Sequence, residues 1–202
     1  MAELPPERDL GLILKIKSLE MKKVYLALSL GATAFLVWAF VNPQTNNTTA
    51  PDHGAIKWYS FEEAVALSAK KPKKMFIDVY TDWCGWCKKM DQSTFTDPQV
   101  AEFMNRNFYA VKFNAEQKEL VQFKGHELKY MPNAGRRGVH ELAYALLDGR
   151  LGYPSFVYLD ENQNRISISP GFKNGDVMLK ELRYIAEGHF KNKTWEEYSN
   201  SK

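Results

Sequence analysis

The sequence predicts an α/β fold in which a mixed central sheet carries helices on both faces, with a membrane-spanning helix ahead of it. Three observations support this prediction. Residues 24–41 form an apolar run without a single charge. From residue 57 onward, apolar runs typical of buried strands alternate with amphipathic segments typical of helices. The only two cysteines of the chain directly follow the first of those strands, at the start of a predicted helix.

Length and charge narrow the class of protein. The 202 residues suffice for one globular domain with appendages, and 12 Phe, 10 Tyr and 5 Trp can supply a core. The formal net charge is +3, with acidic and basic residues interspersed. The sequence shows no basic face interleaved with aromatic residues, so we expect no nucleic-acid partner.

The N-terminal region predicts a membrane anchor. A helix over 24–41 is close to the shortest that spans about 30 Å of hydrocarbon. Lys22 and Lys23 precede it, which places residues 1–23 in the cytoplasm as a tail and the rest of the chain outside. The tail is alternatively a mis-assigned start before Met21, because Met21 followed by two lysines also resembles the start of a secretory signal.

An uncleaved signal anchor is favoured because no clean cleavage site ends the apolar run. A cleaved signal and a buried core helix are the alternatives. Both export readings place the cysteines in an oxidising compartment, the periplasm if the source is bacterial, where a disulfide persists. Residues 42–56 are polar and rich in turn formers, which indicates a linker.

The folded domain is predicted over 57–191. Ser60 and Glu63 form a capping box that begins a helix ending near residue 69. Asp97 followed by Pro98 begins another helix. The other predicted elements of this half are a strand at 75–80, a helix from the cysteines to about 93, and a strand at 108–113. Asp78 is an anomaly, since a carboxylate in a buried strand requires a reason.

The second half of the domain is less regular. Residues 115–150 are expected to be helical with breaks at glycine and proline, and 139–147 is the best helix among them. Strands follow at 155–160 and 165–169, joined by a turn. Gly175 and Asp176 are expected to cap a final helix that reaches about 187, and residues 192–202 form a C-terminal tail.

Cys84 and Cys87 stand two residues apart at a strand–helix junction. A thiol at a helix N-terminus has a lowered pKa because the helix dipole stabilises the thiolate, and the second thiol is near enough to close a disulfide. This layout suits thiol–disulfide exchange. Closed structural zinc would need four ligands, and the histidines, His53, His126, His140 and His189, are scattered. Copper(I) suits two thiolates better and remains an alternative.

The sequence resembles the thioredoxin superfamily over roughly residues 57–189, and several motifs at separate positions carry the resemblance. Residues 83–88 match the family motif W-C-G-P-C-K except at Trp86. The stretch 94–100 resembles an exported subgroup that includes bacterial periplasmic proteins. Further matches are a buried carboxylate at Asp78, the lysine that approaches it at Lys112, the cis-proline at Pro154 after Tyr153, and a groove-lining glycine at Gly171. The resemblance implies a thioredoxin-like three-layer α/β/α sandwich.

The resemblance also implies roles for these residues. Cys84 is expected to attack the substrate disulfide, and Cys87 to resolve the mixed disulfide. Asp78 is expected to be a base with a raised pKa that takes the Cys87 proton, although a simple ion pair with Lys112 is an alternative. The expected substrate-contacting residues are Trp83, Gly85, Trp86, Tyr153, Pro154 and Gly171. A cis Pro154 would leave the backbone of Tyr153 free to pair with the substrate.

Two departures from the family limit what the resemblance implies. Trp86 replaces the proline of the motif, so the redox potential is open between about −270 and −120 mV. The segment 124–151 is longer than the family needs before the cis-proline. We expect a helical insert there, which either shapes partner choice or is a plain elaboration of the fold.

The sequence therefore predicts a membrane-anchored, extracytoplasmic thiol–disulfide oxidoreductase that acts on protein disulfides, more as a reductase than as an oxidase. Its expected partners are protein disulfides or dithiols and a membrane or soluble thiol that exchanges electrons with it. No cofactor and no metal are expected. The alternatives are a copper(I)-handling module and a non-catalytic thioredoxin-fold binding module.

Overall fold

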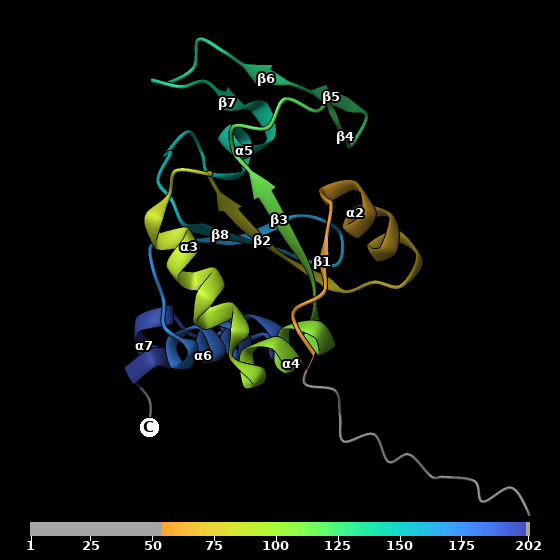
Figure 1. Ribbon diagram of the computed structural model, residues 1–202. Coiled ribbons are helices and arrows are strands. Elements are labelled where there is room, and N and C mark those ends of the chain that lie inside the picture. Colours follow the sequence, from red (N-terminus) through yellow and green to blue (C-terminus); the bar gives the residue numbers. More distant parts are fainter. Residues whose placement is uncertain (1–53, 201–202) are drawn as a thin grey trace, which may run out of the picture. The chain divides into compact units, whose positions relative to one another are not determined.

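The computed structural model describes residues 54–200. Their centre is a five-stranded sheet in the order β1-β3-β2-β8-β9 (Figure 1). The first three of these strands run parallel, while β8 is antiparallel to β2 and β9 is antiparallel to β8. The bounds are β1 (Trp58–Tyr59), β2 (Lys74–Tyr80), β3 (Phe108–Asn114), β8 (Ser155–Leu159) and β9 (Arg165–Pro170). The predicted mixed sheet is confirmed.

Helices cover both faces of this sheet, which confirms the predicted three layers (Figure 1). One face carries α3 (Gly85–Gln92), α4 (Pro98–Asn107) and α6 (Gly175–Ala186), and the other carries α2 (Phe61–Lys70) and α5 (Glu141–Leu146). Successive strand residues point to opposite faces of a sheet. In β2, Phe76 therefore packs in the core under α3, α4 and α6, and Ile77 packs in the core under α2 and α5.

The ends of two helices follow from their sequence. Ser60 Oγ accepts a hydrogen bond from the Glu63 N–H while the Glu63 carboxylate accepts one from the Ser60 N–H, so α2 has the predicted capping box. The Asp97 carboxylate likewise accepts from the first N–H groups of α4, and Pro98 occupies the first helical position. A short 3₁₀ turn, η1 (Thr94–Thr96), joins α3 to α4.

The predicted helical insert over 124–151 is wrong, because most of the segment's regular structure consists of short strands. Two hairpins lie here, and the first begins just before the segment: β4 (Val121–Phe123) pairs with β5 (His126–Leu128), and β6 (Tyr130–Met131) pairs with β7 (Val139–His140). Lys124 and Gly125 both have positive φ, which is the geometry of a tight two-residue hairpin loop. Strands this short display no measurable alternation, so the apolar residues resembled broken helices. The predicted helix 139–147 is shortened to α5.

The boundaries of the domain also differ from the prediction at both ends. Ile56 is only 5% exposed, so the linker predicted over 42–56 extends too far into the folded part. The side chain of Asn174, rather than Gly175 or Asp176, caps α6. Within the predicted tail, and after the short turn η2 (His189–Lys191), the helix α7 (Trp195–Asn200) packs Trp195 against Tyr184 of α6. Aromatic packing therefore extends the core beyond the predicted end.

Over residues 54–200, none of the helices has the length and apolar character needed to cross a membrane. The predicted span at 24–41 and the tail at 1–23 lie outside the described residues.

His140 joins the insert to the rest of the domain. Its side chain is fully buried, and its Nδ1 accepts the N–H of Leu142 at the start of α5. Its Nε2–H donates to the carbonyl of Glu119 at 3.0 Å. Burial lowers the pKa of His140, so the ring is neutral near pH 7 and both hydrogen bonds persist.

We expect His140→Ala to lower the free energy of unfolding by about 2 to 4 kcal/mol, because it removes a helix cap, a buried hydrogen bond and packed volume. Urea unfolding of the full chain measures this. His126→Ala, on the exposed strand β5, is the matched control and should change stability by no more than about 0.5 kcal/mol. Equal effects of the two substitutions would contradict the anchoring role of His140.

Candidate active site

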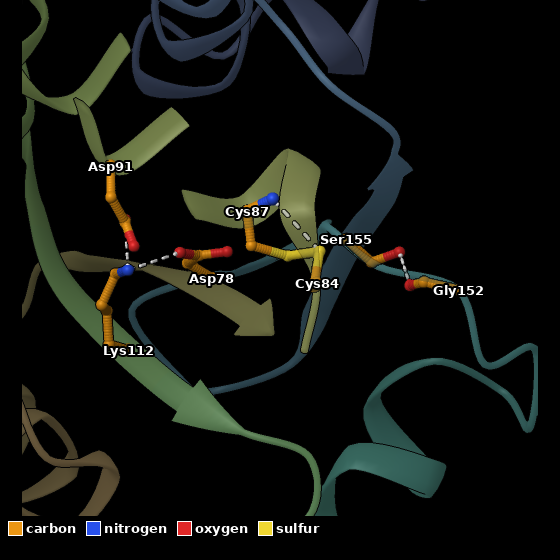
Figure 2. The surroundings of a disulfide bond; sticks show 7 residues. All are labelled: Asp78, Cys84, Cys87, Asp91, Lys112, Gly152 and Ser155. Atoms are coloured by element: carbon orange, nitrogen blue, oxygen red, sulfur yellow. Dashed lines mark hydrogen bonds and ion pairs between the residues drawn. A yellow bond between two sulfur atoms is a disulfide. The ribbon is translucent and has the colours of Figure 1, made fainter. Parts of the chain in front are cut away.

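Cys84 and Cys87 form a disulfide at the N-terminus of α3 (Figure 2). Cys84 is the N-cap residue, and its Sγ accepts the N–H of Cys87 at 3.1 Å. Its position at the positive end of the helix is the one that stabilises a thiolate once the disulfide is reduced. The two residues are 4% and 3% exposed, so a reaction partner must approach closely. Gly85 begins α3, and a side chain there would meet open space.

A buried carboxylate lies beside the disulfide on the same side of the sheet. Asp78 is 1% exposed, and in the view of Figure 2 it lies between Lys112 and Cys87. The Lys112 ammonium is 3.5 Å from Asp78 Oδ2 and also pairs with Asp91 on α3. Asp78 Oδ1 has no hydrogen-bond partner among the described residues, so it can accept a proton.

Burial raises the pKa of Asp78 to about 7, while the nearby Lys112 charge opposes the rise and Asp91 adds to it. A carboxyl group that titrates near neutral pH is suited to general base catalysis. Asp91 was not anticipated as part of this group. Asp91 follows Cys84 by two helical turns on the same helix, and this spacing is the sequence signal that could have placed it near the site.

The predicted cis peptide bond is confirmed between Tyr153 and Pro154. The Gly171 N–H donates to the Pro154 carbonyl at 2.8 Å, which joins the loop after β9 to the cis-proline loop. Gly171 has a φ of +90°, a conformation that favours glycine at this position. The structure thus places both predicted groove residues against each other at the edge of the site.

Exposed aromatic rings flank the disulfide, and Trp83 is one of them. Its ring packs edge-on against Tyr153, with 5.9 Å between the centroids. Its Nε1–H donates to Glu116 at 2.8 Å, and the Arg137 guanidinium lies 5.6 Å from the ring centroid. Trp83 is 52% exposed despite these contacts, so part of the ring is free to meet a partner.

Trp86 forms a second aromatic pair, with Phe172 from the loop after β9, at 5.3 Å between centroids. The Lys89 ammonium lies close to both rings. Both tryptophans were predicted as contact residues, but their neighbours were missed. Lys89 follows Trp86 on the same helix, whereas the other missed neighbours come from segments far away in the chain. The missed neighbours are Lys89, Glu116, Arg137 and Phe172.

Among residues 54–200, no group of three or more His, Cys, Asp or Glu side chains has an arrangement that could hold a metal ion.

Comparisons with known proteins agree with this geometry. A family model named Thioredox_DsbH and described as "Protein of unknown function, DUF255" matches residues 45–164, more than half of the chain. The chain belongs to this family. The Thioredox_DsbH assignment is consistent with a solved structure described as "DsbH Oxidoreductase", which has a TM-score of 0.50 and 18% identity over 74% of this chain and 97% of that one. That likeness shows the shared thioredoxin-like fold.

Two curated relatives carry the name thiol:disulfide interchange protein DsbD. The one from Tatumella citrea is 28% identical over 156 residues, which cover 73% of this chain and 23% of the relative. The one from Haemophilus ducreyi is 38% identical over 85 residues, which cover 40% of this chain and 15% of the relative. The matched part therefore spans less than a quarter of either relative. The protein class predicted from the sequence, a thioredoxin-like thiol–disulfide oxidoreductase, agrees with these comparisons.

We expect Asp78→Asn to slow the closure of the Cys84–Cys87 disulfide at pH 7 by about 10- to 100-fold, because a general base is lost. In the wild type this rate should rise with pH through about 7 as Asp78 loses its proton. Stopped-flow measurement across pH 5 to 9 tests both points. Asp91→Asn is the control, since it keeps the buried carboxyl: the inflection should remain but move to lower pH, because the Asp91 charge no longer raises the pKa of Asp78. An unchanged inflection in Asp78→Asn would contradict the assignment.

The same substitution has a predicted effect on stability. The pKa of Asp78 is higher in the folded chain than its ordinary value of 3.8, so the contribution of this group is greatest at low pH and is lost as pH rises through about 7. Asp78→Asn should therefore raise the free energy of unfolding at pH 8, by at most about 4 kcal/mol, and should have less effect at pH 5. Urea unfolding at both pH values measures it.

Proposed function

We propose that this chain is an extracytoplasmic, membrane-anchored oxidoreductase that reduces disulfides in other proteins. The observation that carries the proposal is the Cys84–Cys87 disulfide at the start of α3, on the same side of the sheet as the buried carboxylate of Asp78. The cis peptide at Pro154 adds a further feature of thiol-exchange proteins with this fold. The relatives named for thiol:disulfide interchange support the same chemistry.

The reaction begins from the reduced pair. The Cys84 thiolate attacks one sulfur of the substrate disulfide, the other substrate sulfur leaves as a thiolate that takes up a proton, and a mixed disulfide forms. Asp78 then accepts the Cys87 proton, and the Cys87 thiolate attacks Cys84 Sγ. The second substrate sulfur leaves and is protonated, and Cys84 and Cys87 are joined as in Figure 2. Two electrons pass to the substrate, so a dithiol donor must restore the reduced pair.

The proposed location and electron partner rest on the sequence. The apolar run at 24–41 would hold the chain in the membrane with the domain 57–191 outside, or would be cleaved to release it. A reductase outside the cytoplasm needs electrons from a thiol partner in the membrane or in solution. The reducing direction is proposed because the motif of residues 83–88 is nearer to reducing members of the superfamily.

The segment 124–151 would contribute to the choice of protein substrate. Its Arg137 lies against Trp83, next to the reactive Cys84. A guanidinium that lies near a ring face keeps N–H groups available for a carboxylate or carbonyl of a partner. The Tyr130 hydroxyl donates to the Arg137 carbonyl, which fixes the loop that presents this arginine.

We expect the Cys84–Cys87 pair to have a reduction potential near −270 mV, measured by equilibrating the full chain with defined glutathione or dithiothreitol buffers. It should also reduce insulin disulfides when dithiothreitol is supplied, and Cys84→Ser should abolish this activity. A potential near −120 mV would reverse the direction and make the chain a disulfide donor. If no reversible couple appears, the oxidoreductase proposal fails and copper content becomes the next measurement.

We expect Arg137→Ala to raise the KM for a protein disulfide by about two- to fivefold, which corresponds to the loss of one exposed hydrogen bond to the partner. Steady-state reduction assays measure the change. Arg136→Ala is the matched control, since it removes the same charge from the adjacent position. If the two variants behave alike, general charge rather than the contact with Trp83 is responsible, and the assigned role of Arg137 is wrong.

A further inference from the structure

The loop Pro170–Lys173, which joins β9 to α6, supplies residues to two parts of the active site. The Gly171 N–H donates to the carbonyl of the cis-proline, Pro154. The Phe172 ring packs against Trp86 inside the Cys motif. A substrate chain that pairs with the backbone near Pro154 must pass close to this loop. The position of the loop therefore affects how a protein substrate docks.

Lys173 fixes the position of this loop through its side chain and its backbone. It is 8% exposed, an unusual degree of burial for a lysine. Its ammonium lies 3.3 Å from the carbonyl oxygen of Pro170 and 3.4 Å from that of Gly171. Its own carbonyl accepts the hydroxyl of Thr94, at the junction of α3 and α4, at 2.6 Å. The loop is thus attached by one buried side chain and one buried backbone group.

The carboxylate of Glu181 on α6 offsets the positive charge of the buried Lys173 ammonium. Its Oε2 lies 3.6 Å from Lys173 Nζ, and the glutamate is itself 4% exposed. It also accepts hydrogen bonds from the Tyr158 hydroxyl at 2.7 Å and the Ser169 hydroxyl at 2.9 Å. The carboxylate is therefore tied to β8 and β9, and through Lys173 to the active-site loop.

A contribution to stability alone poorly explains the buried ion pair of Lys173 and Glu181. A buried ion pair is often no more stabilising than well-packed apolar residues of similar size, because both charges lose their hydration. The Lys173 ammonium lies 4.8 Å from the centroid of the Phe156 ring, so its neighbour on this side is an apolar group. An apolar side chain could not donate to the carbonyls of Pro170 and Gly171, whereas lysine can.

We propose that Lys173, held by Glu181, is a positioning residue for the docking of protein substrates. Its ammonium keeps the Pro170 and Gly171 carbonyls in place, and with them the Gly171–Pro154 hydrogen bond and the Phe172–Trp86 contact. Lys173 has no part in the thiol chemistry itself. The inference rests on the proposed function, which supplies the substrate.

The test compares a protein disulfide with a small one. Insulin must dock on the loop, whereas hydroxyethyl disulfide presents no chain to pair with it. Lys173→Met alone would leave Glu181 charged and unpaired in the interior, which endangers folding. The informative variant is the double substitution Lys173→Met with Glu181→Gln, which removes both charges. The glutamine can still bond Tyr158 and Ser169.

We expect the double variant to raise the KM for insulin by about 10-fold, as for a small displacement of a docking segment. Its kcat, and its rate with hydroxyethyl disulfide, should remain within about twofold of the wild type. Lys180→Met is the control, because its ammonium is on the same helix but donates to Ser199 near the C-terminus. It should leave the KM for insulin unchanged.

Each other outcome has a distinct meaning. An unchanged KM for insulin in the folded double variant would overturn the positioning role. An equal loss with both disulfides would also overturn it, because damage to the fold or to the thiol pair would then explain the effect. If the wild type turns over neither substrate, the proposed function fails, and the role of Lys173 in docking fails with it.

Discussion

The chemistry of the site depends on the register between neighbouring strands of the sheet. Asp78 of β2 is paired with Lys112 of the parallel strand β3 and with Phe156 of the antiparallel strand β8. A slip of one residue would turn every side chain of β2 to the opposite face and move the carboxylate into the core under α2. The buried acid and its cation meet on the sheet face that carries α3, because apolar residues on both sides of Asp78 fix the register.

Local signals in the sequence were sufficient for the larger elements and for the reacting groups. The capping box at Ser60, the Asp97–Pro98 helix start and the cysteine pair each act over a few residues. The cis bond before Pro154 was predicted by the resemblance. The hairpins of the insert were missed because strands of two or three residues are stabilised by their partners, and the sequence alone does not display those partners.

The surroundings of the site were less predictable for the same reason. Trp83 and Trp86 were expected at the surface of the site, but Arg137 and Phe172 reach them from loops remote in the sequence. Both buried ion pairs, of Asp78 and of Glu181, lie in the layer between the sheet and the helices α3, α4 and α6. The approach of Lys112 to Asp78 was predicted through the resemblance. The pair of Lys173 and Glu181 was missed, because the partners of a buried charge are set by tertiary structure that a sequence pattern does not display.

The chain has only two cysteines, and both belong to the reactive pair. With two cysteines there is one possible internal pairing, whereas four allow three. Within this chain no wrong internal disulfide can form, so no isomerase is needed to reach the oxidised pair. A mixed disulfide with a client likewise has a single internal thiol available to release it. The reductase proposed here therefore cannot mispair the two cysteines that its own chemistry uses.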